Sequence, residues 1–251
     1  MIKDEQLISD INGKRLHVID LVFETTWRCN LKCGHCYKED AKPVDIHPKV
    51  PDIVLDYFRC VHEIRLHGGE SQLNPKGLSY INSALARHKT KFNNFSLITN
   101  GTFVNDEFFE ILEEINTKAE RRIGGGVLVG ISDTIWHDEA YLKVGLTRED
   151  VFNNYTQMKK KHPKLRIFFD DRRTRKSSIH AVGRAKEFDG TDKNITRNEF
   201  KFHYGRLLRF KTDPRGNAIQ SWRENHVGSD KSFGNILKKP IPDMLIEHGI
   251  G

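Results

Sequence analysis

Short apolar segments alternate with longer amphipathic segments along most of this sequence, and this alternation is the strongest constraint on its fold. The short segments are rich in β-branched and aromatic residues, which is typical of strands. The longer segments carry apolar residues three and four positions apart, which is typical of helices. Alternating strands and helices predict an α/β architecture with a parallel sheet. The predicted strands are 16–25, 64–67, 95–99, 127–131 and 165–169, and the predicted helices are 48–62, 75–89, 106–119 and 147–162.

The number of strand-helix units limits the architecture further. Five or six units fit before about residue 185, with a short sixth strand at 179–182, and the chain is too short for eight units and a tail. We therefore expect a partial (β/α)6 TIM-like barrel or an open doubly wound sheet. Two later strands flank residues 213–217, which form a β-hairpin signal. The predicted domains are a partial barrel over 1–186 and a small C-terminal β-hairpin appendage over 187–251.

Cysteine usage and charge restrict the class of protein. Four cysteines among 251 residues are too few for a disulfide-stapled secreted protein. The first residues are acidic where a secretory signal is basic, and no run of 18 apolar residues occurs, so we expect a cytoplasmic protein without a membrane segment. The net charge is +7, and it is unevenly placed: residues Lys159 to Arg215 hold 18 Lys/Arg against 7 Asp/Glu, a local +11, whereas the rest of the chain sums to −4. This basic lobe is interpreted either as a solvated face or as a surface for RNA, an acidic peptide or a phosphorylated compound.

Three of the four cysteines, Cys29, Cys33 and Cys36, lie on one short segment, residues 29–36, here called the cysteine loop. Cys33 and Cys36 alone have the spacing of a thioredoxin-like redox pair, which leaves Cys29 unexplained. With His35 or His47 as a fourth ligand the thiols match a zinc site, although structural zinc sites usually use two separated ligand pairs. Three thiolates also match an iron-sulfur cluster whose open iron takes a substrate or a cofactor. The spacing leaves these three interpretations open.

Polar residues follow the ends of the next three predicted strands. Gly68-Gly69-Glu70 follows the second strand, Thr99-Asn100-Gly101 the third and Ser132-Asp133 the fourth. The carboxyl ends of parallel strands meet at one rim, where ligands bind in barrels and in open α/β sheets. We therefore expect these residues to converge on the cysteine loop.

Taken in order, these motifs resemble the radical S-adenosylmethionine (radical SAM) superfamily. The resemblance rests on Cys-x3-Cys-x2-Cys after the first strand, Gly-Gly-Glu at the second, the motifs that end the third and fourth strands, and Gly183-Arg184-Ala185 after the last strand. The resemblance extends over residues 17–240. Within the superfamily, the sequence is especially similar to the branch with a SPASM or twitch extension.

The resemblance implies one 4Fe-4S cluster and S-adenosylmethionine as cofactors. Cys29, Cys33 and Cys36 would ligate three irons and leave the fourth iron for the amino and carboxylate groups of S-adenosylmethionine. One electron then cleaves the sulfonium, and the resulting 5′-deoxyadenosyl radical abstracts a hydrogen atom from the substrate. The expected contacts of S-adenosylmethionine are Glu70 at its ammonium group, Gly68 and Gly69 by close backbone approach, Thr99 and Asn100 in the pocket, and Ser132 and Asp133 at the ribose.

Two positions depart from the family pattern. His35 stands before the third cysteine, where the family often has an aromatic residue that packs by the adenine. Ser221 stands where the SPASM pattern has a cysteine, and no cysteine follows Cys60. An auxiliary iron-sulfur cluster is therefore not expected unless other ligands supply it. Cys60 is assigned to the helix at 48–62 as a small buried apolar side chain.

The substrate is less constrained than the cofactors. Relatives with SPASM or twitch extensions often modify ribosomally made peptides, so a peptide held by the basic lobe is the preferred substrate. A nucleotide, a sugar or RNA is the alternative, and a non-catalytic zinc- or partner-binding module is a third interpretation. An electron donor such as a flavodoxin or a ferredoxin is an expected partner. Asp170 and Asp171 at the end of the fifth strand, and Arg184, are the candidate catalytic residues.

Overall fold

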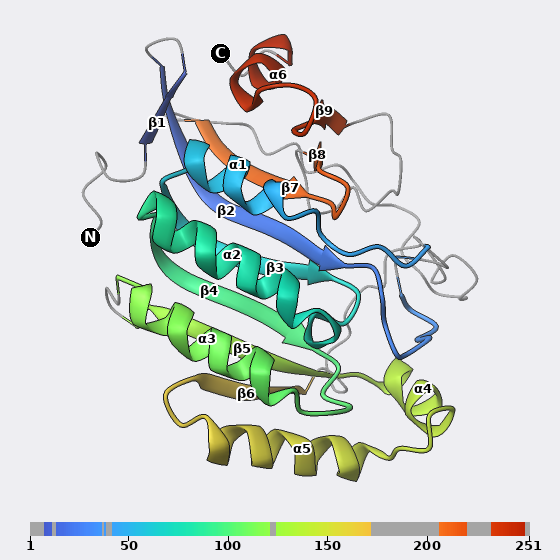
Figure 1. Ribbon diagram of the computed structural model, residues 1–251. Coiled ribbons are helices and arrows are strands. Elements are labelled where there is room, and N and C mark those ends of the chain that lie inside the picture. Colours follow the sequence, from blue (N-terminus) through green and yellow to red (C-terminus); the bar gives the residue numbers. More distant parts are fainter. Residues whose placement is uncertain are drawn as a thin grey trace.

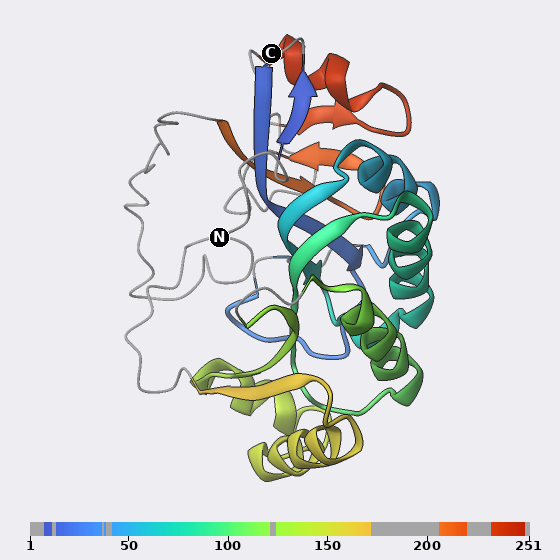
Figure 2. The ribbon, with the colours of Figure 1, turned by 90° about the vertical axis from the view of Figure 1, so that its left-hand side faces the viewer.

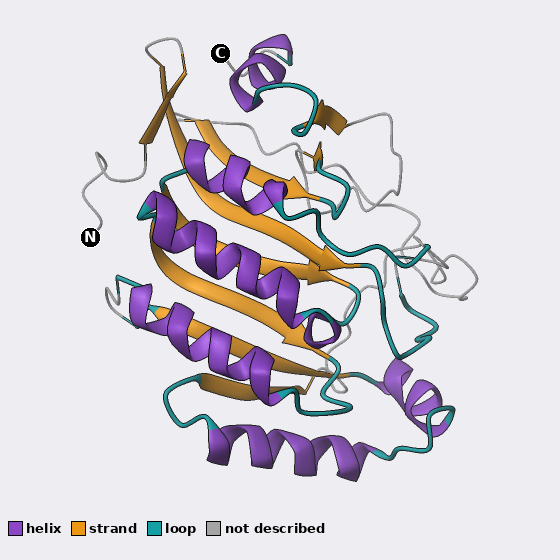
Figure 3. Ribbon diagram, viewed as in Figure 1, coloured by secondary structure: helices purple, strands orange, loops and turns teal. Residues whose placement is uncertain are grey.

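The structure is a computed structural model, in which residues 8–11, 14–36, 38, 42–120, 124–171, 206–219 and 232–248 are described. Strands and helices alternate through most of this part of the chain (Figures 1 and 3). The strands are β1 Ile8–Ile11, β2 Lys14–Thr26, β3 Cys60–Gly68, β4 Lys91–Thr99, β5 Gly126–Asp133, β6 Arg166–Asp171, β7 Arg206–Thr212, β8 Asn217–Ile219 and β9 Ser232–Asn235. The helices are α1 Lys49–Tyr57, α2 Pro75–His88, α3 Asp106–Lys118, α4 Asp138–Leu142, α5 Arg148–Lys161 and α6 Ile241–Glu247, with short 3-10 turns η2 Ser71–Leu73 and η3 Ile135–His137.

One sheet contains all the described strands. Its order is β6-β5-β4-β3-β2-β7-β8-β9, and β1 pairs with β2 outside this order. The ladders from β6 across to β7 are parallel, whereas β8 and β9 join in antiparallel fashion. Figure 2 shows α2 and α3 beside the same side of the twisted sheet. The observed sheet confirms the predicted α/β class, with a parallel sheet of the partial-barrel kind followed by antiparallel strands.

The core lies between the sheet and the helices on one of its faces. Alternate residues of the strands point into it, including Leu21 and Phe23 of β2 and Phe95 and Leu97 of β4, all almost completely buried. Because strand side chains alternate between faces, the residues between these positions lie on the opposite face of the sheet. No helix in the described part of the chain is both long and apolar enough to span a membrane.

Side-chain caps fix where two of the helices begin. Thr147 and Asp150 form a reciprocal capping box at the start of α5, which agrees with the predicted start of this helix at residue 147. The Thr147 N–H donates to Asp150 Oδ2 at 2.8 Å, and the Asp150 N–H donates to Thr147 Oγ1 at 3.2 Å. Asn105 caps α3 by accepting a hydrogen bond from the Phe108 N–H at 3.1 Å. The two caps fix the ends of the connections from β4 to α3 and from β5 to α5, which lie at the carboxyl edge of the sheet.

One predicted helix boundary is wrong. The helix predicted at 48–62 ends at Tyr57, and Cys60 begins β3 instead of lying in the helix. Phe58 leaves the helical conformation, with φ −96° and ψ 82°, yet its side chain is fully buried. Phe58 and Val61 both face the core, so their apolar spacing continues the helical period past the end of the helix.

The predicted C-terminal hairpin is present, and its first strand also pairs with the main sheet. β7 and β8 pair in antiparallel fashion around a turn in which Asp213 Oδ1 accepts from the N–H groups of Arg215 and Asn217 at 2.9 and 2.8 Å. β7 also pairs in parallel with β2 along most of its length. The predicted sixth strand at 179–182 and the predicted boundary between 186 and 187 lie outside the described residues.

Candidate functional site

The polar residues that follow the strands lie along the carboxyl edge of the parallel sheet. β2, β3, β4 and β5 are neighbours in the sheet, so their carboxyl ends lie side by side. In Figure 1 this edge is on the right, where the chain after β2 descends toward α4. The cysteine loop, residues 68–70, residues 99–101 and residues 132–133 therefore share one edge, as the alternation of strands and helices predicts.

Gly68 and Gly69 allow the cysteine loop to cross close to the end of β3. The Gly69 N–H donates to Thr26 O at 2.7 Å, and the Glu70 N–H donates to Arg28 O at 2.8 Å. A Cβ atom on Gly68 would lie 2.3 Å from Thr26 O, and one on Gly69 would lie 2.0 Å from Arg28 O. Both positions therefore require glycine because the chain's own backbone is so near. The close approach visible in the structure fixes the start of the cysteine loop.

The three cysteines of the loop differ in exposure. Cys29 is exposed, Cys36 is partly buried and Cys33 is buried, and none of them forms a disulfide. The Cys36 N–H donates to Cys33 O at 3.1 Å, which closes a turn between these two residues. Although Cys29 is exposed as a whole residue, the protein around its thiol partly desolvates it and raises its pKa; a hydrogen bond to the Leu31 backbone acts to lower the pKa, and Glu70 and Cys36 raise it. The thiol therefore keeps its proton until a cation binds.

The donor set of the loop suits an iron-sulfur cluster. No three Cys, His, Asp or Glu side chains within the described residues already have the geometry of a metal site. Three thiols on one loop, outside any disulfide, are nevertheless the soft ligands that iron-sulfur clusters use. Binding would release the thiol protons and draw the three side chains together. The zinc interpretation needs a fourth ligand in addition to the three thiols, whereas a cluster with an open iron does not.

Glu70 lies at the centre of a buried hydrogen-bond network. Its Oε1 accepts from Thr99 Oγ1 at 2.8 Å, and its Oε2 accepts from the Asn100 N–H at 2.8 Å. The Asn100 amide also points at the cysteine loop, with 3.9 Å between Nδ2 and Cys29 Sγ. Burial raises the pKa of the Glu70 carboxyl, and the hydrogen bonds oppose this rise. The network joins the ends of β3 and β4 to the first cysteine.

Gln72 and Asn105 extend this network although no sequence motif singles them out. Gln72 Nε2 donates to Thr99 Oγ1 at 2.8 Å, and Gln72 Oε1 accepts from the Asn105 N–H at 3.0 Å. Asn105 is the residue that caps α3, so the network reaches from the site to the start of that helix. Their positions just after the strand-end motifs are the one signal in the sequence that points to them.

Ser132 and Asp133, the predicted ribose contacts, have different surroundings. Asp133 is fully buried, and its Oδ2 accepts from Nε and Nη2 of Arg148 at 2.8 and 2.7 Å. Ser132 is partly buried, and its carbonyl accepts from the Tyr141 hydroxyl at 3.3 Å. The Asp133 carboxylate is bound by a residue of α5, so Ser132 is the more accessible of the two to a ligand.

His35, which replaces an aromatic residue of the family pattern, contacts a second imidazole. Its ring centroid lies 4.9 Å from that of His137 in η3, in an edge-to-face arrangement. His137 in turn stacks on Tyr141 at 5.5 Å. The Tyr141 hydroxyl donates to Asn100 O at 3.4 Å and to Ser132 O. This column of rings therefore packs the segment after β5 against the cysteine loop.

The candidate catalytic residues are only partly described. Asp170 is partly buried at the end of β6 and is the register partner of Ser132. Asp171 is the register partner of Asp133. β6 therefore brings both to the same edge of the sheet as the predicted cofactor contacts. Arg184, the rest of the Gly-Arg-Ala motif and position 221 lie outside the described residues.

A buried ionic cluster beside the cysteine loop was missed in the sequence. In this cluster, here called the Glu24 cluster, Lys38 and Lys211 both bind Glu24, with 2.6 Å between Lys211 Nζ and Glu24 Oε1. Trp27 Nε1 donates to Glu24 Oε2 at 2.7 Å. Burial acts to raise the pKa of Glu24, but the charges of Lys211 and Lys38 overcome it and lower the pKa to about 2. Lys211 is so distant in sequence that no local pattern signals the pairing.

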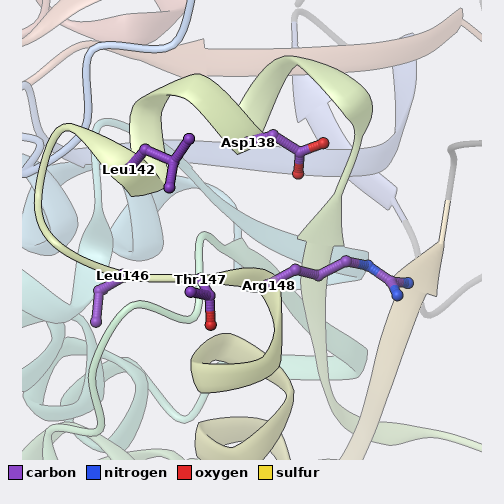
Figure 4. A pocket seen from close by; sticks show the side chains of 5 residues that line it. All are labelled: Asp138, Leu142, Leu146, Thr147 and Arg148. Carbon is purple, nitrogen blue, oxygen red and sulfur yellow. The ribbon is translucent and has the colours of Figure 1, made fainter.

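A pocket between α4 and the start of α5 lies beside the site (Figure 4). It is linked to the site through Arg148, whose side chain extends away from Leu142 and Leu146 and binds Asp133. The residues that line it differ from those predicted to hold the cofactors, and they are Asp138, Leu142, Leu146, Thr147 and Arg148.

The sequence has curated relatives that match part of its length. It is 33% identical over 116 residues to the antilisterial bacteriocin subtilosin biosynthesis protein AlbA of Bacillus subtilis (strain 168), an alignment that covers 44% of this chain and 23% of AlbA. It is 28% identical over 112 residues to the uncharacterized protein MJ0907 of Methanocaldococcus jannaschii, covering 42% of this chain and 38% of that protein. The alignments thus span less than half of either relative.

A solved structure shares the fold over nearly the whole chain. This is native anSMEcpe with bound AdoMet and Kp18Cys peptide, which has a TM-score of 0.61 and 15% sequence identity and covers 93% of this chain and 82% of that chain. Residues 23–161, more than half of the sequence, match the profile of the Radical SAM superfamily. That segment runs from β2 through α5 and contains the cysteine loop and residues 68–70, 99–101 and 132–133. The chain therefore belongs to the radical SAM superfamily.

Proposed function

We propose that the protein is an enzyme that uses one 4Fe-4S cluster and S-adenosylmethionine to modify a ribosomally made peptide. The observation that carries the proposal is the network in which Glu70 and Asn100 join the Gly-Gly-Glu segment to the first cysteine of the loop. When bound, the two cofactors supply the reductive cleavage of S-adenosylmethionine to a 5′-deoxyadenosyl radical, which abstracts a hydrogen atom from the substrate.

Cys29, Cys33 and Cys36 are the proposed cluster ligands. Cys60 is the remaining cysteine of the sequence, and it lies at the amino end of β3, whereas the cysteine loop contacts the carboxyl end of that strand. A strand of this length separates the two ends by about 26 Å. A single cluster is therefore proposed.

Glu70 and Ser132 are the proposed contacts for the amino group and the ribose of S-adenosylmethionine. Three hydrogen bonds, from Thr99, Asn100 and Gln72, hold the Glu70 carboxylate in place. A carboxylate offers about four acceptor positions, so it can still accept a hydrogen bond from an ammonium group. Thr99 and Asn100 act here mainly by orienting Glu70, and Gly68 and Gly69 by positioning the loop.

A peptide substrate is supported by the relatives. AlbA is a biosynthesis protein of the bacteriocin subtilosin, and the anSMEcpe structure contains a bound peptide. Asp170 and Asp171 stay the candidate substrate contacts, because β6 ends beside Ser132. A flavodoxin or a ferredoxin is the proposed class of electron donor.

The cluster is tested by anaerobic reconstitution with iron and sulfide. The wild-type chain is expected to turn brown and absorb at about 400 nm, as iron-thiolate centres do, and Cys33→Ala is expected to lose this absorbance. Cys60→Ala is the matched control and is expected to keep it. A colourless protein that holds one zinc ion would overturn the proposal in favour of the zinc-binding module.

The substrate is tested by mass spectrometry of a precursor peptide encoded beside the gene. Incubation with the reduced enzyme and S-adenosylmethionine is expected to change the peptide's mass and to release 5′-deoxyadenosine. Omitting S-adenosylmethionine is the control. An unchanged peptide, together with retention on RNA that weakens as salt rises, would replace the peptide with a nucleic-acid substrate.

A further inference from the structure

The β7–β8 hairpin contacts both flanks of the cysteine loop. Trp27 precedes Cys29 by two residues, and Lys38 follows Cys36 by two residues. Trp27 contacts Arg215 in the turn of the hairpin. Lys38 binds Glu24, a carboxylate that Lys211 of the hairpin also binds. The role inferred for the hairpin rests on the proposed function, because it concerns how the chain holds the proposed cluster.

Lys211 of β7 and Lys38 share one buried carboxylate. The side chain of Glu24 is 0% exposed, that of Lys211 is 2% and that of Lys38 is 8%. Two charge-assisted contacts to one carboxylate in the interior fix all three side chains, because each charged group depends on the others for compensation. Lys38, two residues after the loop, is therefore held in place through a residue of the hairpin.

Trp27, two residues before the loop, is held by the same groups. The guanidinium of Arg215, in the hairpin turn, lies 4.9 Å from the ring centroid, and the ammonium of Lys38 lies 5.0 Å from it. Both distances are within the range of cation–π attraction. The indole N–H also donates to Glu24. Trp27 thus joins the two flanks of the loop to each other and to the hairpin.

Backbone hydrogen bonds reinforce these contacts. Pro214, in the turn of the hairpin, accepts through its carbonyl from the His47 N–H at 3.0 Å. The segment just before His47 is in turn bonded to the start of the loop, since the Trp27 N–H donates to Val44 O at 2.8 Å. The hairpin therefore contacts the segments on both sides of the cysteine loop through main chain as well as side chains.

Lys211 adds a buried positive charge to these contacts. Lys38 and Lys211 are buried with Glu24, whereas Arg215 is exposed, so its charge is screened. A cluster held by three thiolates is an anion, and it gains a further negative charge when it is reduced. Nearby positive charge in a desolvated setting stabilises the reduced form more than the oxidised form.

We propose that Lys211 and Arg215 are positioning residues for the proposed cluster. The hairpin holds the cysteine loop from both flanks, and the buried charge of Lys211 favours the reduced cluster. In the SPASM pattern, a cysteine for an auxiliary cluster follows this hairpin. In this chain the hairpin is instead proposed to position the loop that holds the single proposed cluster.

Two readouts on the reconstituted full chain test this role. One is the rate at which a chelator bleaches the cluster absorbance, and the other is the reduction potential of the cluster by redox titration. Lys211→Met leaves Glu24 paired with Lys38, so the variant is expected to fold. It should release the cluster about tenfold faster than wild type and have a lower reduction potential. Lys211→Arg should restore both values, and Arg215→Gln, in which the changed side chain is exposed, should release the cluster about threefold faster.

Lys161→Met is the matched control, because it removes an exposed lysine that pairs with Asp106 on the helix layer. It should change neither readout, since exposed charges are screened. Equal release rates and equal potentials for wild type, Lys211→Met and Arg215→Gln overturn the positioning role. Faster release of Lys211→Met with an unchanged potential overturns the charge effect. A wild-type chain that takes up no iron overturns the proposed function itself, and this role with it. Should Lys211→Met not fold, the Arg215→Gln variant decides the outcome.

Discussion

The face of the sheet opposite α1, α2 and α3 has two halves with different chemistry. On β2, β3 and β7 it presents the neighbours Glu24 and His67 together with Lys211, and Glu24 and Lys211 are almost fully buried. On β4, β5 and β6 the neighbouring residues are Ile98, Gly130 and Phe168. Ile98 is 43% exposed and Phe168 is 41% exposed. We call these the charged half and the apolar half.

The difference separates two tasks within one sheet. In the charged half, each ionic side chain contacts its partners so closely that little surface is left for a ligand, which suits the holding of a fixed loop. In the apolar half, two large side chains meet over a glycine and stay open to solvent. On the proposed function, the charged half positions the cysteine loop and the apolar half is the part of this face that a substrate can contact.

The largest expected effect is the loss of the Glu24 carboxylate. Glu24→Gln leaves two buried ammonium groups without their shared partner, so the free energy of unfolding should fall by about 3–5 kcal/mol. Urea denaturation of the chain measures it. Glu139→Gln, which removes an exposed carboxylate that pairs with Lys143, is the control and should leave the midpoint unchanged. A loss under about 1 kcal/mol for Glu24→Gln would mean that water reaches the charged half.

A pH titration sharpens the same comparison. Burial and then the charge of Lys211 lower the pKa of His67 from 6.5 to about 4. The unfolded chain therefore binds a proton at higher pH than the folded chain, so stability from the neutral imidazole is complete above pH 6.5 and is lost as the pH falls toward 4. The loss is up to about 3 kcal/mol. Urea midpoints between pH 7 and pH 4 should show it for wild type and not for His67→Gln, and parallel curves for the two proteins would contradict the assignment.

In the apolar half, the addition of one methyl group should lower the free energy of unfolding by less than the changes to Glu24 and His67 do. A Cβ atom on Gly130 would lie 2.7 Å from Ile98 Cδ1 and 2.9 Å from Phe168 Cζ, which are the far ends of side chains that can rotate. Gly130→Ala should therefore reduce the free energy of unfolding by about 1 kcal/mol. Gly68→Ala is the contrasting variant and should cost more, because there the added atom meets the backbone carbonyl of Thr26 at 2.3 Å. Equal losses would show that the apolar half is as tightly packed as the end of β3.

The smallest loss of stability is expected when the exposed ring of Phe168 is removed. Phe168→Ala should change the free energy of unfolding by less than about 1 kcal/mol, because much of the side chain already contacts water. Phe95→Ala, on the core face of β4, is the matched comparison and should cost about 3–5 kcal/mol. A loss above about 2 kcal/mol for Phe168→Ala would remove the contrast between the two halves.

The parallel sheet and the strand-end motifs could be predicted because both are local in the sequence. Strand period and helix period differ, so the order of elements from β2 to β6 is visible without any knowledge of contacts. Glu70, Thr99 and Asn100 meet because parallel strands carry their carboxyl ends to one edge. The capping box of Thr147 and Asp150 needs only residues three positions apart.

The parts that could not be predicted depend on distant residues or on packing. The pairing of β7 with β2 joins segments at opposite ends of the described chain, and nothing local in either strand specifies it. The Glu24 cluster follows from that pairing, so Lys211 could not be connected with Glu24 and Lys38. The end of α1 was missed because Phe58 and Val61 face the core from two different elements. The roles of Arg184 and position 221 stay predictions.

The place of β7 beside β2 has a consequence for how the protein matures. The cysteine loop is synthesised early, whereas the hairpin that contacts its flanks emerges from the ribosome long afterwards. Contacts between segments so distant along the chain form late in folding, since a large loop must close first. A nascent chain therefore presents its three thiols before Lys211 and Arg215 can secure them. On the proposed function, the cysteine loop therefore lacks its contacts to the hairpin until the last part of the chain has folded.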